Sequence, residues 1–181
     1  MLGPRHAVRL VFLAAIIDCQ QRMLPQPAVQ TEASAEGELI SRQRQRVGTA
    51  TFTQTPAGVR VNVQLFSLPR GRHAVHIHQA GRCDLPRFAA AGDHFAEPGQ
   101  QNGMESSRGP HSGDLPNVVV AVDGFGSLST VNPYVTLRPG ANSLLRSGGT
   151  ALIIHADPDD YRTDPFGNSG ERIACGVIRS R

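Results

Sequence analysis

The chain has 181 residues, a length that suits one domain with its own hydrophobic core and is short for two. All 18 basic residues are arginine and the net charge is only +3; from residue 47 onward, twelve arginines face eleven acidic residues. No basic stripe with interleaved aromatic residues occurs and tryptophan is absent, which argues against a nucleic-acid-binding protein.

The N-terminus has the pattern of an export signal, predicted over residues 1–19. Basic residues precede the apolar run LVFLAAII (10–17), which is too short to span a bilayer. A short buried helix is the alternative. Cys19 offers a possible lipid-attached membrane anchor, although Asp18 is not the small residue that such sites prefer. We therefore expect a protein of the periplasm, cell envelope or extracellular space.

Residues 20–46, rich in Gln, Ala and Glu, are predicted to form a flexible linker to a folded domain over 47–181. Export places that domain in an oxidising compartment. Its two cysteines, Cys83 and Cys175, could then form a disulfide, and two buried free thiols are the alternative.

Short strands dominate the domain. Residues 48–71 alternate in period two on both sides of the turn TPAG, which predicts a hairpin. Further strands are predicted at HAVHIH, on both sides of DGFG, at ALIIHA and at RIACGVI, and long loops at 84–117 and 156–172. This pattern predicts an all-β sandwich or flattened barrel, with function concentrated in the two long loops.

The stretch HAVHIHQAGRC (73–83) places three of the seven histidines within six positions. Val75 and Ile77 are β-branched and favour a strand, in which side chains two apart share a face. His76 and His78 should point the same way and His73 the opposite way. The pair is either half of a metal site or two exposed polar residues.

Other ligand-type residues come from separate segments. His94, His111 and Asp114 lie in the first long loop, and His155 ends the strand ALIIHA. Sites rich in imidazole suit copper and zinc, whereas carboxylate-rich sites suit calcium or magnesium. The chain has no HExxH motif, nucleophile elbow or phosphate-binding glycine loop.

These motifs, read together, resemble the copper/zinc superoxide dismutases, in particular their exported bacterial type. The resemblance covers about residues 47–179 and rests on HAVHIH, GRC, AGDHF, HSGDLPN, LIIHADPDDY and GNSGERIACGVI, in the family's order. It implies an eight-stranded Greek-key β-sandwich or flattened barrel, with copper and zinc as cofactors and superoxide as substrate.

The resemblance assigns a role to each ligand-type residue. The positions that match the copper ligands are His76, His78, His94 and His155. His94 matches the histidine that bridges the two metals, and His111 and Asp114 match two further zinc ligands.

The same resemblance extends beyond the ligands. Cys83 and Cys175 match the family's disulfide, and Arg172 matches the arginine that guides the superoxide anion. Asp159 matches the carboxylate that links ligands of the two metals. His73 matches a histidine that is not a ligand, and we expect it to hydrogen-bond to backbone groups.

One zinc ligand of the family is missing. Asn102 occupies the matching position, and no histidine lies between His94 and His111. Zinc favours four ligands with nitrogen or sulfur donors. Water, Glu97, Glu105 or the Asn102 oxygen would have to complete the site, so we predict an enzyme that holds copper alone or binds zinc weakly.

The predicted function is superoxide disproportionation at a redox-cycling copper, with His94 exchanging a proton and Arg172 attracting the anion. The alternative is a non-enzymatic copper-binding or metal-storage protein of the cell envelope on the same fold; a purely structural sandwich is a third option with no need for the ligand set. Oligomeric state is left open.

Overall fold

Eight antiparallel strands close into a barrel in the computed structural model, which describes residues 32–181. The strand order is β1-β2-β3-β6-β5-β4-β7-β8, with β8 pairing back to β1. The neighbours β3–β6 and β4–β7 are not consecutive in sequence, as Greek-key connections require. The strands are β1 (Ser34–Ser41), β2 (Arg46–Thr55), β3 (Gly58–Leu65), β4 (Gly71–His78), β5 (Asp114–Val120), β6 (Gly126–Asn132), β7 (Thr150–His155) and β8 (Arg172–Ser180). The predicted all-β barrel is confirmed.

Every second side chain along the strands points into the barrel and fills its interior. In β3, Val59, Val61 and Val63 are buried while Arg60 between them is exposed. Equivalent positions of the other strands complete a core of mainly aliphatic side chains, to which Phe52 and Phe95 add aromatic rings. Burying each such side chain contributes about 1.5–3 kcal/mol to stability. This core gives the strands that carry histidines a rigid base.

The linker predicted over 20–46 is wrong from residue 34 onward. Residues 34–41 form β1, which pairs with both β2 and β8 and closes the barrel. Ala35 and Leu39 point inward, while charged side chains point out, so the polar composition hid a period-two strand. The remainder of the predicted linker, up to residue 31, and the predicted export segment with Cys19 lie outside the described residues.

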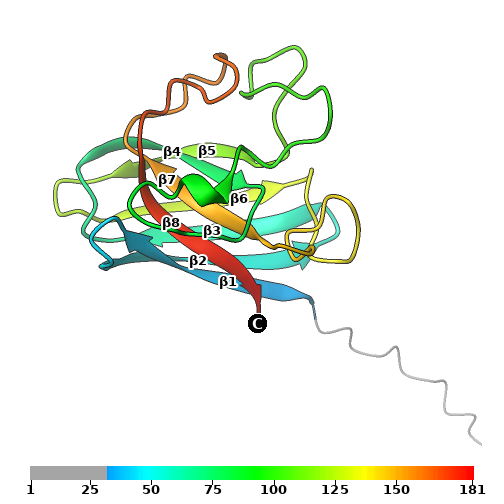
Figure 1. Cartoon of the computed structure of the whole chain (residues 1–181), viewed down its shortest axis with the longest axis horizontal. Helices are drawn as coiled ribbons and strands as arrows, with labels where there is room; N and C mark the ends of the chain where they lie inside the picture. Colours follow the sequence, from blue (N-terminus) through cyan, green and yellow to red (C-terminus); the bar gives the residue numbers. More distant parts are fainter. Residues whose placement is uncertain (1–31) are drawn as a thin grey trace, which may run out of the picture. The chain divides into compact units, whose positions relative to one another are not determined.

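Two long loops lie side by side on one side of the barrel, beyond β4 and β5 (Figure 1). The first connects β4 to β5 and includes one short 3-10 helix, η1 (Ala89–Ala91); the second connects β7 to β8. The first loop ends at residue 113, slightly earlier than predicted, because β5 begins at Asp114. Within residues 32–181, no helix is long and apolar enough to span a membrane.

Candidate metal centre

Strand alternation places three histidines on the outer side of the barrel wall. In β4, Val75 and Ile77 join the interior core, so His76 and His78 face the other way, as predicted. The neighbouring strand β7 ends at His155. The long loops cover this outer face and leave all three imidazoles at most 3% exposed, which excludes the alternative of an exposed polar pair.

The fourth histidine arrives from the first loop. His94 pairs with His78 through an isolated β-bridge, which brings its ring against the strand histidines. The ring centroids of His94 and His76 are 3.9 Å apart, and those of His94 and His78 are 5.0 Å apart. One potential ligand atom from each of the four histidines lies within 4.8 Å of the others. The sequence prediction of this set is confirmed as a geometric cluster.

Each imidazole presents one nitrogen that has no partner within the described chain. These buried atoms are His76 Nδ1, His78 Nε2, His94 Nε2 and His155 Nε2. A buried polar atom without a hydrogen bond costs about 1–3 kcal/mol, so four of them in one place require a function. Four convergent nitrogen donors form a site for a metal that accepts imidazole, such as copper or zinc.

The opposite ring nitrogens fix how the imidazoles are oriented. His78 Nδ1 lies 2.8 Å from the carbonyl oxygen of Gly92, and His155 Nδ1 lies 3.4 Å from that of Gly170. His76 Nε2 lies 3.0 Å from Asp159 Oδ2. A metal-binding imidazole commonly donates its other N–H in this way, which sets its tautomer and direction.

Burial keeps three of the four imidazoles, those of His78, His94 and His155, uncharged. It lowers the pKa of His155 to about 2 and that of His94 to about 4, and it also lowers the pKa of His78; neighbouring imidazoles add to each effect. The rings of His78, His94 and His155 are therefore neutral at pH 7, which is the form that binds metal.

His73 has a different role. It is buried, and its Nδ1 and Nε2 each lie 2.8 Å from a backbone carbonyl oxygen, of His155 and Pro69 respectively. Both ring nitrogens are thus occupied. The expectation that His73 bonds to backbone rather than to a metal agrees with these contacts.

A second cluster shares His94 and contains His111 and Asp114. His94 Nδ1 lies 3.3 Å from His111 Nδ1 and 3.0 Å from Asp114 Oδ1. Burial alone would raise the pKa of Asp114, but hydrogen bonds from His111 and His94 bring it well below its usual value. The carboxylate is thus charged at neutral pH. The cluster offers two nitrogens and one oxygen to a cation, and His94 faces both clusters with different nitrogens.

Position 102 does not add a histidine to this cluster. Asn102 is fully buried, and its Nδ2 donates to Asp159 Oδ1 at 3.1 Å and to the carbonyl oxygen of Thr163 at 3.2 Å. Glu105 pairs with Arg162 on the surface, and Glu97 is exposed. Neither glutamate belongs to the cluster.

Arg172 lies beside the four-histidine cluster. It is the cross-strand partner of His155, and its guanidinium donates to the carbonyl oxygens of Phe88 at 2.8 Å and Gly92 at 2.7 Å. Gly92 O is also the partner of His78. Burial lowers the pKa of Arg172, although an arginine keeps its charge at neutral pH. A fixed positive charge therefore stands next to the cluster.

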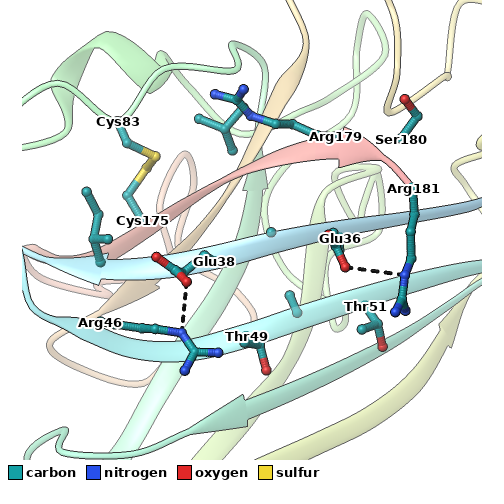
Figure 2. Close-up of a pocket in the computed structure, with 14 residues that line it drawn as sticks. Glu36, Glu38, Arg46, Thr49, Thr51, Cys83, Cys175, Arg179, Ser180 and Arg181 are labelled. Carbon is teal, nitrogen blue, oxygen red and sulfur yellow. Dashed lines mark ion pairs between the residues drawn. A yellow bond between two sulfur atoms is a disulfide. The ribbon is translucent and has the colours of Figure 1, made fainter.

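The predicted disulfide is present. Cys83 and Cys175 are bonded, with their Cα atoms 5.6 Å apart. The bond attaches the first loop to β8 at the edge of a hollow on the outer face of β1, β2 and β8 (Figure 2). Ion pairs between Glu38 and Arg46 and between Glu36 and Arg181 line that hollow. None of the clustered histidines lines it.

Sequence reasoning missed residues that hold Asp159 in place. Asn117 contacts both the backbone N–H and the carbonyl oxygen of Asp159. Gly167, at φ 62°, packs so close to the Asp159 carboxylate that a Cβ there would overlap it. The glycine in FGN was the only available signal, because only glycine tolerates both this backbone conformation and this contact.

Comparison with known proteins agrees with this geometry. The family model described as copper/zinc superoxide dismutase (SODC) matches residues 46–178. The protein named superoxide dismutase [Cu-Zn] 2 of Aquifex aeolicus is 43% identical over 82% of this chain and 88% of its own length. A second protein of that organism, superoxide dismutase [Cu-Zn] 1, is 40% identical over 84% of this chain and 91% of its own.

A Bacillus subtilis protein named superoxide dismutase-like is 33% identical over 90% of this chain and 89% of its own length. The crystal structure titled as a SOD-like protein from Bacillus subtilis has a TM-score of 0.75 at 34% identity, covering 78% of this chain and 96% of that one. The eight-stranded barrel is therefore shared with solved structures.

Proposed function

Because the chain belongs to the copper/zinc superoxide dismutase family, we propose that it converts two superoxide anions and two protons to dioxygen and hydrogen peroxide. The observation that carries the proposal is the set of four buried imidazole nitrogens that converge without a partner. A structural β-sandwich has no use for four uncompensated polar atoms.

The donor set fits copper. Imidazole nitrogens suit copper. Burial keeps the rings of His94 and His155 neutral, and hydrogen-bond partners of the opposite ring nitrogen orient the rings of His76 and His78. When bound, copper supplies a one-electron couple, which takes an electron from one superoxide and returns it to a second.

His94 is assigned the proton exchange. It is the only member of the four whose second ring nitrogen belongs to the other cluster, where Asp114 Oδ1 lies 3.0 Å away. That contact holds the ring in place while Nε2 takes up a proton and gives it back. Hydrogen peroxide needs protons, and a histidine held in this way can deliver one.

Arg172 is assigned the attraction of the anion. Its two hydrogen bonds to Phe88 O and Gly92 O hold the guanidinium at the edge of the copper cluster. A fixed positive charge at the entrance to a buried site raises the rate at which small anions arrive.

The zinc side is proposed to be weak. His94, His111 and Asp114 supply three donors, and position 102 supplies at most an amide oxygen, since Asn102 Oδ1 is buried without a hydrogen-bond partner in residues 32–181. An amide oxygen is a poorer zinc donor than imidazole. Zinc bound here should exchange easily.

A non-enzymatic copper-binding protein is the second candidate. It is favoured by the relative from Bacillus subtilis, which is named only as superoxide dismutase-like although it shares the fold. Such a protein needs the four histidines but has no need for the charge of Arg172 next to them. The presence of Arg172 at that place therefore supports the enzyme.

Export is proposed from the disulfide. The Cys83–Cys175 bond persists in oxidising compartments, in agreement with a periplasmic or extracellular protein.

Turnover of superoxide by the copper-loaded protein tests the function. We expect the wild type to catalyse the reaction. His155→Ala should lose both the bound copper and the activity. His111→Ala, which changes the other cluster, should keep one equivalent of copper. Wild-type protein fully loaded with copper but no faster than buffer would reject the enzyme and favour the copper-binding protein.

A further inference from the structure

Asn102 joins the two long loops. Its side-chain amide donates to Asp159 Oδ1 at 3.1 Å and to Thr163 O at 3.2 Å, and its backbone N–H donates to Asp164 Oδ1 at 2.7 Å. All three acceptors belong to the loop between β7 and β8. Both side-chain contacts are to oxygen acceptors, which fixes the orientation of the amide, because a flipped amide would place its oxygen against the Asp159 carboxylate.

The Asp159 carboxylate passes this constraint on to the copper cluster. Its second oxygen, Oδ2, lies 3.0 Å from His76 Nε2, and Asn102, Asp159 and His76 are all at most 3% exposed. A carboxylate accepts hydrogen bonds, so it keeps the His76 proton on Nε2 and leaves Nδ1 free. Nδ1 is the atom that His76 contributes to the copper cluster.

We propose that Asn102 is a positioning residue for the copper site. Its amide protons hold Asp159, which in turn holds the His76 ring, so hydrogen bonds between the loops align this ligand whether or not the neighbouring cluster contains zinc. The proposal rests on the copper site proposed above and does not depend on superoxide being the substrate.

The other loop contacts of the Asp159 carboxylate come from its own loop, so Asn102 is the donor that holds it from the first loop. Oδ1 also accepts from the backbone N–H of Tyr161 at 2.7 Å, and Gly167 packs directly against the carboxylate. A second connection joins the loops nearby, where Glu105 N donates to Tyr161 O at 3.0 Å. Loss of the Asn102 donor should therefore change the direction of the carboxylate without separating the loops.

Copper affinity of the zinc-free protein tests this role. Asn102→Asp has nearly the same shape but replaces the donor with a carboxylate facing Asp159, and it should weaken copper binding at least about tenfold, the usual lower range for such supporting contacts. Asn102→Ala should act in the same direction. Both should shift the electron paramagnetic resonance spectrum of bound Cu(II), which a loss of overall stability alone would not do.

Asn142→Asp is the matched control, since it makes the same chemical change to an amide that donates to the Tyr134 carbonyl oxygen outside both clusters. It should bind copper as the wild type does. Circular dichroism of the metal-free proteins checks folding, and Asn102→Ala decides the outcome if the charged variant fails to fold.

A double-mutant comparison separates positioning from general structural damage. In an Asp159→Ala background there is no carboxylate to hold, so Asn102→Ala should weaken copper binding no further. The proposal is overturned if Asn102→Ala binds copper as tightly as the wild type with an unchanged spectrum, or if its effect is equally large with and without Asp159. Copper binding is measured without superoxide, so a failure of the proposed catalysis would be seen separately.

Discussion

The two metal clusters share one histidine but are built in different ways. The copper cluster takes His76 and His78 from β4 and His155 from β7, so three of its four rings stand on the barrel wall. The zinc-type cluster takes His94 and His111 from the first loop and Asp114 from the start of β5. The copper ligands on the strands keep their arrangement without a second metal. The zinc-type cluster lies on a loop, and hydrogen bonds from Asn102 hold that loop in place of a fourth zinc ligand.

Removal of the disulfide should give the largest effect, and it should affect the copper cluster more than the zinc-type cluster. Replacing both Cys83 and Cys175 by serine removes a crosslink across 92 residues of sequence separation. The chain-entropy model then expects a loss of about 4–5 kcal/mol in the free energy of unfolding. Denaturant titration of the metal-free protein measures it.

The same double variant sharpens the comparison between the clusters. The carbonyl of Gly92, which orients His78 and Arg172, lies in the loop attached by the disulfide. Copper affinity should therefore fall more than zinc affinity. Equal losses at both metals would show that the disulfide supports the whole barrel rather than the copper half.

Asn102→His should change the zinc half most. An imidazole at this position adds a fourth, nitrogen donor to a cluster that has three ligands, and each tenfold gain in zinc affinity corresponds to about 1.4 kcal/mol. Competition with a zinc chelator measures the affinity, and the thermal midpoint should rise with added zinc.

Copper affinity of the zinc-free variant provides the contrast, because an imidazole N–H at position 102 can donate to Asp159 in place of the Asn102 amide. The copper site should then respond much less than the zinc site. Wild-type protein that keeps one equivalent of zinc through prolonged chelation would contradict the prediction. It would mean that the three ligands and another group already hold zinc tightly.

Arg172→Ala should give the smallest effect on binding and act on rate alone. Removing its charge should slow the encounter with superoxide severalfold and weaken the dependence of the rate on salt. Copper affinity and the thermal midpoint should change little. Arg179→Ala, the same change at an exposed position of the same strand, is the control. Equal slowing in both variants would show that Arg172 contributes only to the overall charge of the protein and does not guide the anion to the copper site.

The strand-borne part of the site could be predicted because side chains two apart share a face, and that rule alone placed His76 with His78. Family motifs supplied the remaining ligands. β1 was missed because its inward positions are small or isolated apolar residues between glutamates, a composition that also suits a linker. The contacts of Asn102 and Asn117 with Asp159 could not be predicted, since they depend on how two irregular loops meet.

The central claim is that the copper site works without zinc. Its most direct test is the superoxide dismutation rate of protein loaded with copper alone, after chelation has removed zinc and metal analysis has confirmed it. The account predicts catalysis that changes little when zinc is added back. A copper-loaded, zinc-free protein that is inactive until zinc is restored would contradict it.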